Sequence, residues 1–141
     1  MTVYVDSSFL VSLYLTDGHS LDSRRRVNTV SQLWLTPLHR AEWAHAAAQH
    51  IFRGVLSVSD AALFDRQLES DRTAGLWREV TLPDHALDLC GDLGRRHGPK
   101  LGIRTLDSLH VACALELKAT HFWTFDERQA KLARAVGLKL T

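Results

Sequence analysis

Residues 121–133 read HFWTFDERQAKLA, and they combine the two kinds of element from which the fold is built. The first five residues are mostly aromatic or β-branched, which is typical of a buried strand. Asp126 follows directly, and the residues after it have the spacing of a helix that runs to Val136. A strand that turns straight into a helix is the repeating unit of an α/β protein.

The same unit occurs twice earlier in the chain. TVYV at residues 2–5 is followed by Asp6 and then by an apolar helical pattern. LWLT at residues 33–36 is followed by Pro37, a residue suited to the first turn of a helix, and that helix is expected to end at Gly54. Strands that alternate with helices predict a parallel sheet with helices on both faces.

The remaining sequence completes this pattern. We expect strands at 77–82 and 138–140, and helices over 19–31, from Ser59, over 84–97 and from Thr105, with a break at Gly98-Pro99. The predicted fold class is α/β, a three-layer α/β/α arrangement around a central parallel sheet of four or five strands. With 141 residues, the chain fits a single domain over residues 1–141.

Composition narrows the class of protein. Hydrophobic residues make up 45% and charged residues 23%, as in ordinary globular proteins. Cys90 and Cys113 lie among apolar residues of predicted helices, so we expect buried free thiols and a reducing, cytoplasmic location. The N-terminal stretch lacks the features of a signal peptide, and no apolar run is long enough for a membrane span, so no membrane association is expected.

Charge by itself predicts no partner. There are 17 Lys+Arg residues against 16 Asp+Glu, a net charge of +1, whereas nucleic-acid-binding proteins are often basic. Arginines are clustered locally at residues 24–26. Such a run forms either a solvated helix face or a phosphate-binding surface, and the sequence leaves both open.

Four acidic residues occupy positions of special interest. Asp6 and Asp126 each end a predicted strand, Glu42 lies early in the helix after the second strand, and Asp107 begins the helix before the fourth. Functional groups of α/β sheets collect at the carboxyl ends of strands, so these four side chains are expected to converge. Each has an alternative role, since aspartates also cap helices and Glu42 could be an ordinary helical acid.

Carboxylates that converge repel one another and raise each other's pKa unless a cation lies between them. Mg²⁺, or Mn²⁺ in its place, takes oxygen ligands of this kind and is suited to the hydrolysis of phosphodiesters. The sequence contains neither the H-E-x-x-H zinc motif nor a Walker-type phosphate loop.

Four segments resemble a known family. YVDSSFL, HRAEWAHA, IRTLDSLHVACAL and FWTFDERQAKLA, in this order, are similar to the four acidic motifs of PIN-domain nucleases. The resemblance covers nearly the whole chain, and its length is that of the VapC toxins of toxin–antitoxin pairs. It implies that Asp6, Asp107 and Asp126 are metal ligands and that Glu42 completes the catalytic acidic pocket.

The resemblance also implies roles for neighbouring residues. Ser8 and Thr124 match hydroxyl residues that fix the geometry of the ligands, although Ser8 could simply cap a helix. His110 stands where the family often has a smaller aliphatic residue. It either bonds Asp107 across one helical turn or is a partly buried histidine with another partner.

The function implied is a magnesium-dependent endoribonuclease that cleaves transfer or ribosomal RNA, is inhibited by a VapB-like antitoxin and forms a homodimer. Two other hypotheses stay open. Histidines acting as general acid and base could cleave RNA without a metal. Alternatively, the scaffold could be a non-catalytic module that binds RNA or protein.

Overall fold

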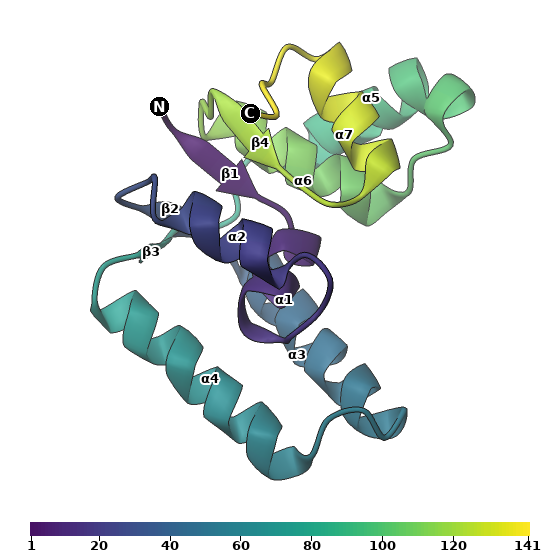
Figure 1. Cartoon of the computed structure of the whole chain (residues 1–141). Helices are drawn as coiled ribbons and strands as arrows, with labels where there is room; N and C mark the ends of the chain where they lie inside the picture. The colour runs from purple at the N-terminus through teal and green to yellow at the C-terminus, as the bar shows by residue number, and fades with distance from the viewer. The chain divides into compact units, whose positions relative to one another are not determined.

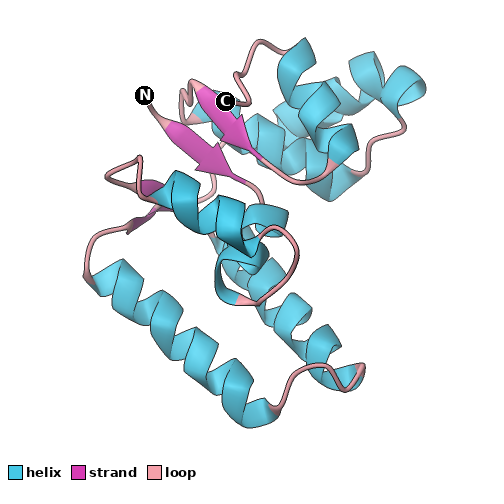
Figure 2. Ribbon diagram, viewed as in Figure 1, coloured by secondary structure: helices cyan, strands magenta, loops and turns pink.

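Short strands and helices alternate along the chain in the computed structural model, which describes residues 1–141 (Figures 1 and 2). The predicted α/β class is confirmed. In chain order the elements are β1 (Val3–Val5), α1 (Ser7–Tyr14), α2 (Ser20–Val27), β2 (Leu33–Leu35), α3 (Pro37–Phe52), α4 (Val58–Thr73), β3 (Trp77–Glu79), α5 (Ala86–Leu101), α6 (Thr105–Glu116), β4 (His121–Trp123) and α7 (Glu127–Ala135).

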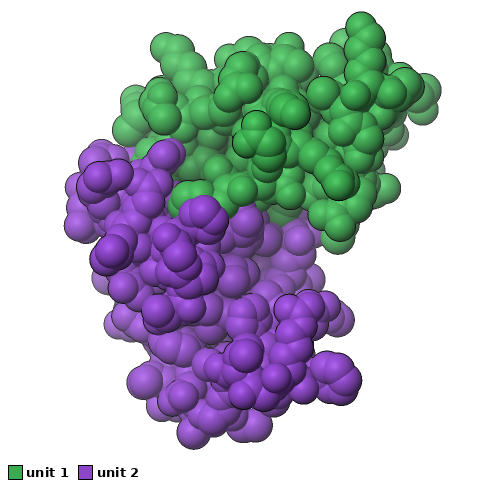
Figure 3. Space-filling view, turned by 45° about the vertical axis from the view of Figure 1, so that its right-hand side comes forward, with its two compact units in different colours: residues 1–6, 81–141 green, residues 7–80 purple.

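The chain divides into two compact units, drawn in separate colours in Figure 3: residues 1–6 with 81–141, and residues 7–80. We call them unit 1 and unit 2. Each unit contains one pair of parallel strands, β1 with β4 in unit 1 and β2 with β3 in unit 2. The parallel pairing was predicted, but the three-residue strands are hydrogen-bonded two by two rather than in one sheet of four or five. The single domain stays a prediction.

Unit 1 is built around β1 and β4, with α5, α6 and α7 packed on one another beside them. The rings of Tyr4 on β1 and Phe122 on β4 stack with their centroids 5.7 Å apart. Cys90 and Cys113 are buried free thiols, as predicted. In place of the predicted last strand, Lys139 forms a single parallel bridge to the first residue of β4.

The predicted break at Gly98-Pro99 is wrong, because α5 continues to Leu101. Pro99 has no N–H and cannot bond the carbonyl four residues earlier, but it lies in the last turn, where few bonds are lost. The helix ends at Gly102, whose φ of 62° is left-handed and whose N–H donates to the Gly98 carbonyl at 2.8 Å. A left-handed glycine is a common end of a helix.

In unit 2, α1 packs against α2, α3 and α4. A buried chain of polar groups holds this unit together: Trp77 Nε1 donates to the Tyr14 hydroxyl at 2.6 Å, and that hydroxyl donates to Asp71 at 2.6 Å. Arg40 forms ion pairs with Glu69 and Glu79. None of the helices in the chain combines the length and the apolar character that crossing a membrane requires.

Candidate functional site

The register of β1 and β4 brings Asp6 beside Thr124 within unit 1. Val5 lies opposite Trp123, so the next residue on each strand is Asp6 on β1 and Thr124 on β4. The Asp6 N–H donates to the Trp123 carbonyl at 3.1 Å, which extends the ladder by one bond. The Thr124 hydroxyl donates to Asp6 Oδ2 at 2.7 Å, and Asp6 is only 4% exposed.

The same threonine leads to Asp126. The Asp126 N–H donates to Thr124 Oγ1 at 2.9 Å, and Asp126 Oδ1 accepts the Gln129 N–H at 2.8 Å. Asp126 is therefore the N-cap of α7, the alternative role that the sequence left open for it. One carboxylate oxygen of Asp126 is used by this cap.

Gln129 joins the third acid to this network, and sequence reasoning missed it. Its side chain is 1% exposed, its Nε2 donates to the backbone carbonyl of Asp107 at 3.0 Å, and its Oε1 lies 3.1 Å from the Thr124 hydroxyl. The signal that could have found it is its place on the buried face of α7, three and four residues before Leu132 and Ala133. A glutamine on an apolar face needs buried partners.

Asp107 lies in the first turn of α6, where a negative charge is favoured by the helix dipole. The Nε of Arg104 donates to Asp107 Oδ2 at 3.2 Å. The side chain of Asp107 is 16% exposed and that of Arg104 is 73% exposed, so this ion pair is at the surface and is weak. The carboxylate of Asp107 is thus partly accessible to solvent. Its position is set mainly by the backbone of α6 and only weakly by the ion pair with Arg104.

Glu42 belongs to unit 2, on α3. The hydroxyl of Ser7, the residue that follows Asp6 in the chain, donates to Glu42 Oε1 at 2.8 Å. Ser8 lies beside Ser7 in the first turn of α1. The predicted convergence of Glu42 with the three acids of unit 1, and the role of Ser8 in fixing ligand geometry, stay predictions.

The partner of His110 is Tyr4. The Tyr4 hydroxyl lies 2.9 Å from His110 Nδ1, and the histidine is 2% exposed. His110 is therefore a buried histidine with a polar partner, one of the two roles that the sequence left open. Its burial argues against a role as a general acid or base.

No group of three or more His, Cys, Asp or Glu side chains is arranged to hold a metal ion. The donor chemistry of Asp6, Asp107 and Asp126 nevertheless fits Mg²⁺, because this cation takes oxygen ligands and is commonly held by one or two carboxylates together with water. In the structure these carboxylates accept hydrogen bonds from Thr124, Arg104 and Gln129.

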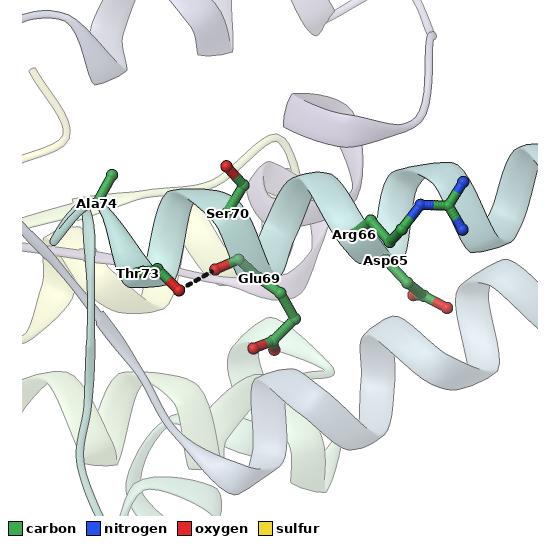
Figure 4. A pocket seen from close by; sticks show the side chains of 6 residues that line it. All are labelled: Asp65, Arg66, Glu69, Ser70, Thr73 and Ala74. Atoms are coloured by element: carbon green, nitrogen blue, oxygen red, sulfur yellow. Dashed lines mark hydrogen bonds between the residues drawn. The ribbon is translucent and has the colours of Figure 1, made fainter.

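A surface hollow lies along α4 in unit 2 and is lined by Asp65, Arg66, Glu69, Ser70, Thr73 and Ala74 (Figure 4). Its carboxylates already have protein partners. Glu69 pairs with Arg72 and Arg40, whose hydrogen bonds lower its pKa, and Asp65 accepts a hydrogen bond from Trp43 at 2.7 Å. Nothing in this hollow favours a second site.

The fold is similar to those of three solved proteins. VapC20 of Mycobacterium tuberculosis, described as a Sarcin-Ricin loop cleaving toxin, matches with a TM-score of 0.70 and 13% identity, over 99% of this chain and 98% of that one. FitAcB of Neisseria gonorrhoeae has a TM-score of 0.72 and 13% identity, covering 99% and 96%. VapBC2 of Rickettsia felis, bound to a DNA fragment from its promoter, has a TM-score of 0.69 and 14% identity, covering 100% and 98%.

Identities this low establish the fold alone. The comparison with curated proteins finds no match. The model of the PIN domain, however, matches residues 3–135, which include all of unit 2, most of unit 1 and all four predicted acids. The chain therefore belongs to the PIN domain family.

Proposed function

We propose that this protein is a metal-dependent endoribonuclease, the toxin of a VapBC-type toxin–antitoxin pair. The observation that carries the proposal is the hydrogen-bond network of unit 1, in which Thr124 and Gln129 link Asp6 after β1 and Asp126 after β4 to the backbone carbonyl of Asp107 in the first turn of α6. Aspartates that only cap separate helices do not need a shared threonine and a buried glutamine between them. A site that must position several carboxylates does need groups that hold those carboxylates together.

Asp6, Asp107 and Asp126 would hold Mg²⁺, or Mn²⁺ in its place. When bound, such a cation polarises a phosphodiester and supplies hydroxide near neutral pH. The residues of the chain orient the ligands: Thr124 fixes one oxygen of Asp6, and the Gln129 N–H fixes one oxygen of Asp126. The expected products carry a 5′-phosphate and a 3′-hydroxyl.

The proposed substrate is a loop of transfer or ribosomal RNA in the cytoplasm. Support comes from VapC20, whose fold this chain shares and which is described as cleaving the Sarcin-Ricin loop. The solvent-accessible side of the site carries Arg104, which is 73% exposed and could contact a phosphate beside Asp107.

The proposed partner is a VapB-like antitoxin, and the proposed assembly is a homodimer. The fold shared with VapBC2 supports this partner. Co-expression with the protein encoded beside this chain should yield a complex that purifies as one species and lacks ribonuclease activity. A neighbour that neither binds nor inhibits would count against this pairing.

The test of the activity is cleavage of end-labelled transfer and ribosomal RNA by the purified chain in Mg²⁺, with and without EDTA. Asp6→Asn and Asp107→Asn should abolish cleavage, because each removes a charge from the proposed cation ligands while leaving a side chain of the same size. Circular dichroism and the thermal midpoint should remain those of the parent.

The matched control is Asp92→Asn. Asp92 pairs with Arg95 three residues later on α5, much as Asp107 pairs with Arg104, but it lies outside the network. This variant should cleave like the parent. Full cleavage by both Asp6→Asn and Asp107→Asn would contradict the proposed site. Cleavage in EDTA that leaves 2′,3′-cyclic phosphates would favour the histidine mechanism.

A further inference from the structure

Gln129 is a buried polar residue of unit 1 whose side-chain amide is bonded at both ends. It is 1% exposed, and its two side-chain polar atoms lie 3.0 Å from the Asp107 carbonyl and 3.1 Å from the Thr124 hydroxyl. Its backbone N–H donates to Oδ1 of Asp126, the N-cap of α7. One residue thus contacts α6, the end of β4 and the start of α7.

The contacts determine which way the amide faces. A carbonyl oxygen can only accept, so the atom of Gln129 that faces the Asp107 carbonyl must be the NH₂ group. The amide oxygen therefore faces Thr124, where it can only accept. Two acceptors, Asp6 Oδ2 at 2.7 Å and Gln129 Oε1 at 3.1 Å, then compete for the single hydroxyl hydrogen of Thr124.

This competition matters for a cation ligand. A carboxylate oxygen that binds a cation has less capacity to accept a hydrogen bond, and a hydroxyl that loses its acceptor in a part-buried place is destabilising. Gln129 Oε1 removes this penalty because the Thr124 hydroxyl can turn to it. Meanwhile the hydroxyl oxygen keeps accepting the Asp126 N–H.

We propose that Gln129 is a positioning residue for cation binding, acting through Thr124 on Asp6 and through the backbone carbonyl on Asp107. The proposal rests on the proposed function, since it names the residue that allows the acidic site to accept its cation. Gln129 itself touches neither cation nor RNA.

The experiment compares two substitutions on the same face of α7, Gln129→Met and Leu132→Met, in the full chain. Both positions are buried, and both variants place methionine there, but only the first removes the amide. Binding of Mn²⁺ and Mg²⁺ is measured by isothermal titration calorimetry, without RNA, and stability is measured by thermal unfolding.

We expect Gln129→Met to weaken cation binding by about 10- to 100-fold, the range typical of residues that orient metal ligands. Leu132→Met should bind like the parent. Combining Gln129→Met with Thr124→Val should weaken binding by less than the product of the two single effects, because the two residues act through one hydrogen-bond path. If Gln129→Met does not fold, Gln129→Asn keeps the amide but is too short for both partners, and it should weaken binding in the same way.

Unchanged affinity in the folded Gln129 variant would overturn the positioning role and leave the proposed function intact. Equal weakening in Gln129→Met and Leu132→Met would also overturn it, since the effect would then follow from the packing of α7. If the parent chain itself binds no divalent cation at millimolar concentration, the proposed function fails, and the role of Gln129 fails with it.

Discussion

Thr124 shows how much of the site depends on one hydroxyl group. Its oxygen accepts from the Asp126 N–H, and its hydrogen is directed at Asp6, a residue 118 positions away in the chain. Water cannot easily replace the bond to Asp6, because Asp6 is 4% exposed. The threonine therefore serves the stability of unit 1 as well as the geometry of the acids.

Thr124→Val removes the hydroxyl and keeps the shape of the side chain. It should lower the free energy of unfolding by about 1–3 kcal/mol, because it leaves a buried carboxylate oxygen and a backbone N–H without their partner. Thr124→Ser retains the hydroxyl and should lose less. Urea unfolding of both variants checks this, and equal stability of the two would contradict it.

Helix termini are where the elements of unit 1 meet the candidate site. Asp126 is the N-cap of α7, Asp107 lies in the first turn of α6, and Gly102 caps the end of α5 only two residues before Arg104. Aspartate at the start of a helix is favoured by capping and by the helix dipole, so a structural role and the proposed role as a cation ligand coincide at these positions. Substitutions that keep one role and remove the other can separate them.

Asp126 offers such a separation. Asp126→Asn keeps an oxygen that can cap α7 but removes the charge, whereas Asp126→Ala removes both. We expect Asp126→Ala to lower the free energy of unfolding by about 1 kcal/mol and Asp126→Asn to change it little. Both should lose RNA cleavage, and cleavage by Asp126→Asn at the parental rate would exclude the charge from catalysis.

Gly94 inside α5 and Gly102 at its C-cap should respond oppositely to alanine. Gly102 has a φ of 62°, so Gly102→Ala should lower the free energy of unfolding by about 1 kcal/mol. Gly94 lies inside the helix, and a Cβ there would meet nothing within 4 Å, so Gly94→Ala should raise it by about 0.5–1 kcal/mol. Thermal or urea unfolding tests the pair, and a stabilised Gly102→Ala would show that α5 does not end on this residue.

At the scale of the whole molecule, each unit buries a weak acid that must keep its proton. In unit 1, burial raises the pKa of the Cys113 thiol to about 11, and the Cys90 and Glu116 charges add to this effect against a hydrogen bond from Tyr4. In unit 2, burial and the hydrogen bond to Asp71 raise the pKa of Tyr14 far above its ordinary value. Folding therefore favours the neutral form of both groups.

The stability of the protein should consequently fall in alkaline solution. A thiol whose pKa rises from 9.0 to about 11 on folding contributes fully below pH 9, and this contribution is lost as the pH passes 11. The expected loss from Cys113 is about 2 kcal/mol. Thermal unfolding between pH 8 and pH 11 measures it, and Cys113→Ala, although less stable throughout, should show a smaller decline over this range than the parent.

The α/β class, the positions of most strands and helices, and the placement of acids after β1 and β4 could be predicted from the sequence. These features follow from local physics: short runs of apolar, aromatic and β-branched residues for the strands, the 3.6-residue period of apolar side chains for the helices, helix caps and turn residues. Local signals also misled at Gly98-Pro99, because a proline in the last turn costs little when a left-handed glycine ends the helix three residues later.

Which side chains meet could not be predicted in this way, because it depends on the packing of the whole chain. The contact of Thr124 with Asp6 depends on the register of two strands far apart in the chain, and a shift by one residue would turn these side chains to opposite faces. The partners of Gln129 and His110 depend on how α6 and α7 pack beside β1 and β4. Such contacts arise from long-range packing, which no local pattern of apolar and polar residues specifies.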